Sequence, residues 1–243
     1  IHEGHIVRDD LPGLYAIDHD ERLREEDPYT EFTIRDVPNR IVFHRSRFEV
    51  DINRHRDGAV YLTPEQAWGL RVWTDAPSQE NVDASLQVHD AYYDMLLNVL
   101  RGIEREYGRF VLLDIHSYNH RRDGPDAAPT AQPQAPDINI GTFSLDRARW
   151  SPVVDTLIDH FRSFDINGRQ LDVRENVAFQ GKGEQTRFVH QHFPLTGCAI
   201  AVEFKKFFMD EWTGEPDMWM LSQLRNIVAA AVPVLEKTLA GSS

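Results

Sequence analysis

The chain has little cysteine, no long apolar run and a shortage of basic residues, and each shortage excludes a class of protein. The 243 residues include one cysteine, which excludes an intrachain disulfide framework and predicts a reducing compartment, the cytoplasm. No run approaches ~18 apolar residues, the length typical of a membrane span. The formal net charge of -13, from 26 basic and 39 acidic side chains, argues against nucleic acid or an anionic membrane as a partner.

Two motifs that often identify phosphate or zinc sites are also missing. Gly181 and Gly183 do not form a phosphate-binding loop, because no helix beginning with Lys-Ser or Lys-Thr follows them. His2 and His5 are three residues apart, whereas the helical zinc-protease motif places two histidines four apart with a glutamate between them. The chain opens on polar residues without a signal-peptide pattern. We expect native sequence to precede Ile1, because a strand would be needed to position the first histidine.

Hydrophobic periodicity predicts helices that alternate with buried strands. Residues 82–107 carry an apolar stripe at helical spacing, with Asn81 as the candidate N-cap and Gly108 as the end. The continuous apolar run 110–113 that follows is typical of a strand covered on both faces. The other predicted elements are a strand over 47–53, a helix over 150–164, a strand over 169–179, a strand over 198–204 and a helix over 216–240 in which Pro233 should cause a kink.

This order of elements predicts the fold class. Alternating helices and doubly covered strands indicate an α/β domain of three layers with a mixed or parallel central sheet, and the length fits one domain over residues 1–243. Residues 9–40 are charged and broken by prolines, so we expect irregular structure with short helical turns. Residues 118–136 contain four prolines and no periodic pattern, which is typical either of a mobile flap over a site or of plain surface disorder.

Three histidines are candidate metal ligands. His2 and His5 are close enough in sequence for both imidazoles to reach one side of a tight turn. His116 follows a buried strand, at the edge of the sheet where α/β enzymes place their sites. Three protein ligands and one open position for water make the usual catalytic zinc site, so this set predicts one Zn²⁺ per chain. Asp114, on the same strand face as His116, could orient its ring. The alternative is a terminal, tag-like pair of histidines and one hydrogen-bonded histidine at a strand end.

Glu203 is the candidate general base. It is the one carboxylate in the apolar run 198–204, and a buried carboxylate is costly unless it is paired or used in chemistry. In a metal hydrolase it would accept a proton from water and then protonate the leaving nitrogen. The alternative is a Glu203 at the end of the strand that pairs with Lys205 or Lys206.

Two arginines are candidates for binding an anionic substrate. Arg54 follows the predicted strand 47–53, and a guanidinium binds a carboxylate through two parallel hydrogen bonds. Arg187 lies in a segment, 181–187, whose composition predicts a flexible polar loop between strands. Either could hold a substrate carboxylate or polarise the scissile carbonyl. The alternative for each is a solvated surface side chain.

Three segments together resemble the N-formylglutamate amidohydrolase family: residues 51–54, residues 112–120, and residues 202–206 with 208–211. They occur in the order expected for that family. The family is similar to the zinc carboxypeptidases and to the aspartoacylase-type deacylases. The resemblance therefore implies a zinc-carboxypeptidase-like (phosphorylase/hydrolase-like) α/β fold with a mixed central sheet.

The resemblance also implies roles for individual residues. His2 matches the first metal ligand and His116 the third, whereas His5 stands where the carboxypeptidases have a glutamate. The Asn53-Arg54 pair matches the pair that binds the substrate carboxylate. Glu203 matches the general base.

These observations lead to the hypothesis of a zinc-dependent amidohydrolase. It would remove an N-acyl group, with N-formyl as a candidate, from an acidic amino acid such as glutamate. The expected partner is a small N-acyl amino acid, with no nucleic acid and no membrane, and the oligomeric state is not predicted. A carboxypeptidase-like metallopeptidase and a non-catalytic family member that binds a carboxylated metabolite are the alternatives.

Overall fold

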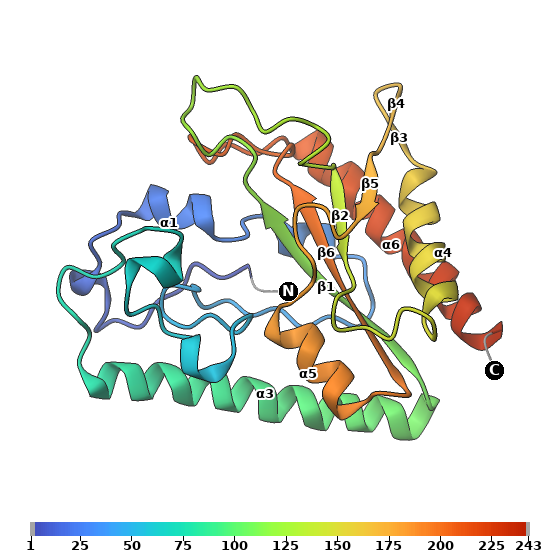
Figure 1. Cartoon of the computed structure of the whole chain (residues 1–243), viewed down its shortest axis with the longest axis horizontal. Helices are drawn as coiled ribbons and strands as arrows, with labels where there is room; N and C mark the ends of the chain where they lie inside the picture. The colour runs from blue at the N-terminus through green and yellow to red at the C-terminus, as the bar shows by residue number, and fades with distance from the viewer. Residues whose placement is uncertain (1–2, 242–243) are drawn as a thin grey trace.

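A mixed four-stranded sheet forms the centre of the computed structural model, which describes residues 3–241 (Figure 1). β1 pairs with β6 in parallel, β2 pairs with β6 antiparallel, and β5 pairs with β2 in parallel. This arrangement confirms the mixed central sheet predicted from the sequence. In the spatial order β1-β6-β2-β5, the strands are β1 (Phe110–Tyr118), β6 (Gly197–Lys205), β2 (Ile138–Gly141) and β5 (Val173–Glu175).

Helices cover both faces of this sheet. The main ones are α3 (Gln79–Tyr107), α4 (Ser151–Arg162), α5 (Glu184–His192) and α6 (Met218–Gly241). On one face α4 and α6 share a hydrophobic cluster with Ile115 of β1 and Val202 of β6. On the other face α3 and α5 enclose Phe110 of β1 and Ala199 of β6 (Figure 1). The sheet is therefore the middle layer of three.

The alternation of side chains along β1 and β6 decides which residues face each layer. Successive side chains on a strand point to opposite faces. Because Ala199 faces α3 and α5, Glu203 four residues later faces the same side. Phe110 likewise puts His116, six residues later, on that side. Both polar side chains therefore leave the sheet in the same direction, near the carboxyl ends of two parallel strands.

Residues 3–77 wrap around those strand ends with little regular structure (Figure 1). They build a hydrophobic cluster of their own around Phe48, Tyr61 and Trp73. The irregular structure predicted for residues 9–40 is confirmed. The short elements of the chain are η1 (Pro12–Leu14), α1 (His19–Glu25), α2 (Thr30–Thr33), η2 (Arg56–Gly58), η3 (Pro64–Ala67) and the hairpin of β3 (Asp165–Ile166) with β4 (Arg169–Gln170).

Most of the longer predicted elements are present. α3 ends at Gly108 as expected, with a left-handed φ of 77° that favours glycine. It begins earlier than predicted, because the N-cap is Ser78, whose Oγ accepts the N–H of Asn81 at 3.2 Å. The predicted strands 110–113 and 198–204 correspond to β1 and β6, which are both nine residues long.

Three predicted segments differ from the structure. The strand over 47–53 is wrong: this stretch forms turns, and its alternating apolar residues are buried without a neighbouring strand. Of the strand over 169–179, residues 169–170 and 173–175 are extended in the sheets. The loop over 181–187 is wrong from residue 184 onward, where α5 begins after Gly183. The helix has only nine residues and a polar outer face, so its hydrophobic periodicity is too weak to predict a helix. The two glycines that precede it indicate a loop instead.

Among the helices of residues 3–241, α6 is the one whose length and apolar composition would allow it to cross a membrane. Its residues Leu221, Leu224 and Val228 are buried against the sheet and α4. These contacts make its inner face part of the core. Pro233 lies inside the helix, which continues to Gly241.

A close approach of two backbones fixes the loop before α5, and it leads to a first prediction. A Cβ at Gly141 would lie 2.5 Å from the backbone N of Gly181, so Gly141→Ala forces these two backbone segments apart. We expect a loss of about 1–3 kcal/mol in the free energy of unfolding. Gly102→Ala is the matched control: Gly102 lies inside α3, a Cβ there would meet only Arg105 Nη2 at 3.9 Å, and alanine should stabilise by about 0.5–1 kcal/mol. Urea denaturation of both variants measures this; equal effects would contradict the argument.

His190 connects α5 to β6 in its neutral form, and this predicts a pH dependence of stability. Nε2 accepts the N–H of Ala199 at 3.0 Å, so Nδ1 carries the proton and faces Ser144 Oγ at 2.9 Å. Burial lowers the pKa of His190 to about 4. Between the unfolded pKa of about 6.5 and pH 4, the unfolded chain binds a proton that the folded protein does not, so stability falls as the pH falls.

The slope from this one group is at most about 1.4 kcal/mol per pH unit, and less because the ring is partly exposed. Denaturation curves at pH 7 and pH 5 should therefore differ less for His190→Gln than for the wild type. The same difference in both proteins would show that another group causes it.

Candidate active site

The carboxyl ends of β1 and β6 form the floor of a cavity of about 730 Å³. The parallel register places His116 of β1 directly opposite Glu203 of β6. The opposite wall comes from the N-terminal part and from the segment that enters α5. Side chains predicted from the sequence that line this cavity are Asn53, Arg54, His116, Arg187 and Glu203.

His116 is buried between two carboxylates. Its Nε2 lies 3.0 Å from Asp114 Oδ1, and its Nδ1 lies 3.3 Å from Asp27 Oδ2. Burial lowers the pKa of His116, but Asp114, Glu203 and Asp27 outweigh it and raise the pKa well above its ordinary value. The position of Asp114 is the one expected for a group that orients the ring. Its Oδ1 in turn accepts Nε2–H of Gln185 at 2.5 Å.

Asp27 is a site residue that sequence reasoning missed. It is 1% exposed and accepts hydrogen bonds from the backbone N–H and Oγ of Ser117, both at 3.0 Å. Arg47 Nη2 donates to its Oδ2 at 2.7 Å. Burial raises the pKa of Asp27, but the nearby Arg47 and His116 lower it by more. The net effect is a pKa below the ordinary value, so the carboxylate is ionised. No local pattern separates Asp27 from the other acids of residues 20–31, because its partners are distant in sequence.

Lys206 holds the chain that leads to Asp27. Its ammonium group is buried and donates to the carbonyls of Arg24 at 2.6 Å and Glu26 at 2.8 Å. Burial lowers the pKa of Lys206 to about 8. The lysine side chain therefore reaches from the end of β6 to the segment after α1 and fixes its backbone.

Glu203 is 9% exposed, and no lysine within residues 3–241 pairs with it. Lys205 pairs instead with Asp137 at 3.0 Å, and Lys206 makes the carbonyl contacts described above. Burial raises the pKa of Glu203, and the negative charge of Asp27 raises it further. The nearby His116 lowers it, and the net result is a pKa of about 7. A carboxyl group with such a pKa can both accept and donate a proton near neutral pH.

The Asn53-Arg54 pair occupies a turn that α3 holds from outside. Tyr93 donates its hydroxyl to the carbonyl of Ile52 at 2.5 Å, and His89 Nε2 lies 3.0 Å from the carbonyl of Arg54. The guanidinium of Arg54 is about half exposed in the cavity, with its Nε 3.7 Å from Asp51 Oδ2. A cation on a fixed turn at the cavity wall is suited to bind a carboxylate.

Arg187 lies on α5, and not in a flexible loop. Its Nε donates to Glu184 Oε2 at 2.9 Å, and about half of the side chain is exposed. The N-cap of this helix, Gly183, packs against Asn53: a Cβ there would lie 2.0 Å from Asn53 Oδ1. The helix thus brings Arg187 to the cavity beside the Asn53-Arg54 pair.

His5, the other predicted ligand within residues 3–241, is not in this group. His2 lies outside the described residues. His5 Nδ1 lies 2.5 Å from Oε2 of the buried Glu26, and His5 does not line the cavity. Within the part of the chain that the structure describes, no three His, Cys, Asp or Glu side chains are grouped to hold a metal ion.

Two candidate ligand atoms nevertheless have the spacing found between zinc ligands. The distance of 3.3 Å between His116 Nδ1 and Asp27 Oδ2 is long for a charged hydrogen bond. It equals the edge of about 3.3 Å of a tetrahedron whose bonds are 2.0–2.1 Å long. The imidazole and carboxylate therefore fit two positions of a zinc site.

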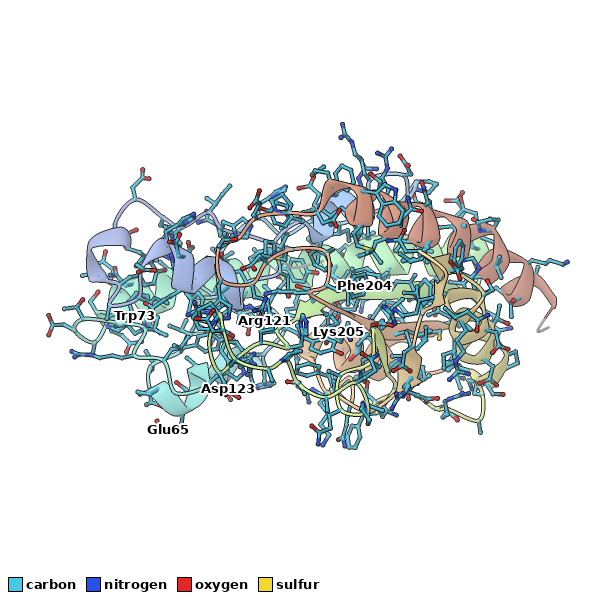
Figure 2. All side chains as sticks on the ribbon, turned by 90° about the horizontal axis from the view of Figure 1, so that it is seen from above. Glu65, Trp73, Arg121, Asp123, Phe204 and Lys205 are labelled. Carbon is cyan, nitrogen blue, oxygen red and sulfur yellow. The ribbon has the colours of Figure 1, made fainter. Side chains whose placement is uncertain are left out.

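The segment after β1 reaches the cavity with its first residues. Asn119 and Arg122 belong to the lining, and Arg122 Nη1 lies 3.2 Å from Glu25 Oε2. In projection from above, Figure 2 shows Arg121 and Asp123 between Trp73 of the N-terminal part and Lys205 of β6. Whether the whole segment 118–136 acts as a flap stays a prediction.

Comparison with known proteins gives both a family match and a fold match. The model of a family described as N-formylglutamate amidohydrolase matches residues 1–208. The structure resembles an N-formylglutamate amidohydrolase from Ralstonia eutropha JMP134, with a TM-score of 0.76 and 14% identity over 99% of this chain and 92% of that one. It also resembles a gene product from Agrobacterium tumefaciens, with a TM-score of 0.63 and 14% identity over 97% and 89% of the two chains. No curated protein matches the sequence.

Proposed function

This chain belongs to the N-formylglutamate amidohydrolase family, as its motifs predicted, and we propose that it is a zinc-dependent enzyme that hydrolyses the amide bond of an N-acyl amino acid. We propose N-formylglutamate, or a close relative with an acidic side chain, as the substrate. The observation that supports this best is the register of β1 and β6, which places His116 beside Glu203 at a cavity that also contains Arg54. We further propose that the fold is zinc-carboxypeptidase-like.

We propose His116 and Asp27 as two zinc ligands and His2 as the third. Their spacing supports the first two, and the sequence match supports His2. His5, predicted as a ligand, hydrogen-bonds to Glu26 and is the weaker candidate. A bound Zn²⁺ would lower the pKa of a coordinated water and polarise the scissile carbonyl.

The protein side chains supply positioning and proton transfer. Arg54 with Asn53 binds a substrate carboxylate, and Arg187 binds the second one. Glu203 accepts a proton from the attacking water; the C–N bond breaks, and Glu203 returns the proton to the leaving nitrogen. The products are the free carboxylic acid of the acyl group and the amino acid.

The cavity also supports a second candidate, a carboxypeptidase-like metallopeptidase. A volume of about 730 Å³ is in the range that holds drug-sized ligands, so a dipeptide would fit. The same arginine could bind the carboxylate of a peptide. For either enzyme we propose a cytoplasmic location, which the free and buried Cys198 supports.

A hydrolysis screen of the full-length protein tests the proposal. The substrates are formyl-, acetyl- and succinyl-glutamate, the corresponding neutral N-acyl amino acids, and dipeptides, each with and without added zinc. We expect turnover of an N-acyl glutamate, about one zinc per chain by metal analysis, and loss of turnover with a chelator. Cleavage of dipeptides alone would favour the peptidase, and a metal-free protein without turnover would favour a binding protein.

A further inference from the structure

The chain just after β1 is held rigidly at the cavity. The backbone N–H of Lys206 donates to the carbonyl of Tyr118 at 3.0 Å. On the other side, the buried carboxylate of Glu211 accepts the backbone N–H of His120 at 2.7 Å. Asn119 lies between these two contacts, so its backbone is fixed from both sides. Its side chain is presented to the cavity by the fold and not by a freely moving loop.

The side chain of Asn119 is buried, and its amide oxygen lacks a hydrogen-bond partner in the part of the chain that the structure describes. It is 7% exposed and lines the cavity, and its Oδ1 has no hydrogen-bond partner among residues 3–241. Buried side-chain oxygens are nearly always hydrogen-bonded, so an exception at a cavity wall points to a ligand that supplies the donor. An unmade bond of this kind destabilises the protein until the ligand arrives.

The chemistry of the proposed substrate identifies this donor. An N-acyl amino acid with ionised carboxylates carries one N–H group, that of the scissile amide, and otherwise presents acceptors. A second unpartnered acceptor, Asn53 Oδ1, packs against Gly183, and Asn53 already belongs to the pair proposed to bind the carboxylate. Of the two buried, unpartnered amide oxygens that line the cavity within residues 3–241, Asn119 Oδ1 is therefore the one not already assigned to the carboxylate, and it can accept the amide N–H.

We propose that Asn119 is a substrate-binding residue whose Oδ1 accepts the N–H of the scissile amide. The inference rests on the proposed amidohydrolase function and deepens it, because this contact favours a secondary amide over an analogue without the N–H. The contact orients the C–N bond and holds the nitrogen that receives the proton when this bond breaks. An ester analogue lacks the N–H and makes no such contact.

The variant Asn119→Leu tests this on two substrates that differ in one group. These are the N-acyl glutamate that the wild type cleaves best, and the 2-acyloxyglutarate with the same acyl group. We expect kcat/KM to fall about 10- to 100-fold on the amide, the usual consequence of losing a hydrogen bond at a buried site. On the ester the fall should be less than about threefold.

Two further measurements separate binding from a structural role. Without substrate, the melting temperature of Asn119→Leu should equal or exceed that of the wild type, because an unpartnered oxygen has been removed. Asn119→Asp keeps an acceptor, so it should retain the ratio of amide to ester turnover even where its added charge lowers both rates. This variant also gives an answer where Asn119→Leu does not fold.

The outcomes distinguish this inference from the proposed function. A wild type that cleaves no N-acyl amino acid overturns both. A wild type that cleaves the amide, with variants that lose amide and ester turnover equally or lose neither, overturns the role of Asn119 alone.

Discussion

Replacing Glu203 with glutamine should lower kcat by about 10²- to 10⁴-fold, the contribution of a positioned general acid–base. Glutamine keeps the shape of the side chain but cannot take up the proton of the attacking water. It also removes a carboxyl group whose burial raises its pKa to about 7, so the fold should not lose stability. Initial rates at saturating substrate measure kcat, and zinc content with thermal unfolding shows whether the site is otherwise intact.

A matched control is available on the surface. Glu65 lies on η3 at the edge of the molecule in Figure 2, and Glu65→Gln should leave kcat unchanged. Retained activity in Glu203→Gln would remove Glu203 from the proton transfer. Loss of zinc from that variant would instead assign it to metal binding.

The second large effect is expected at Asp27, in stability and in zinc affinity together. Asp27→Ala leaves the guanidinium of Arg47 without the carboxylate at 2.7 Å and leaves the N–H of Ser117 without an acceptor. Breaking a buried ion pair on one side typically costs about 3–5 kcal/mol. Chemical denaturation at neutral pH measures the change, and titration with zinc measures the loss of a proposed ligand.

Two comparisons isolate the cause of this loss. Asp36→Ala removes the same side chain from an exposed pair with Arg225 and should have little effect. Asp27→Leu with Arg47→Leu removes both buried charges and should recover part of the stability, because the guanidinium of Arg47 is no longer buried without the carboxylate of Asp27. A double variant no more stable than Asp27→Ala would show that the pair itself is not the source.

The residues that could be predicted from the sequence are those that lie at the ends of buried strands. His116 and Glu203 are polar residues in apolar runs, and that contrast is visible without a structure. The distance between them could not be predicted, because it depends on the parallel register of two strands about 80 residues apart. Local periodicity contains no information on which strands pair.

The site residues that were missed come from irregular segments. Asp27 follows α1 in a turn, and its site contacts are made by residues 47, 116 and 117. Lys206 was considered only as an alternative partner of Glu203, because its carbonyl partners lie about 180 residues away. The alternation over 47–53 did reflect burial, but burial against α3 and the N-terminal cluster and not against a strand. Such contacts arise from tertiary packing, which outweighs local propensity.

The strand side and the N-terminal side of the cavity are stabilised by different kinds of contact. His116 and Glu203 belong to β1 and β6, which pair over nine residues, so the amide hydrogens bonded in this ladder should exchange more slowly than those of the irregular segment. Asp27 and Arg54 sit on turns of an irregular segment, fixed by a few contacts from Lys206 and from α3. Local opening should therefore release that wall first. In mild denaturant, catalysis would then disappear while the helical signal of the molecule is still intact.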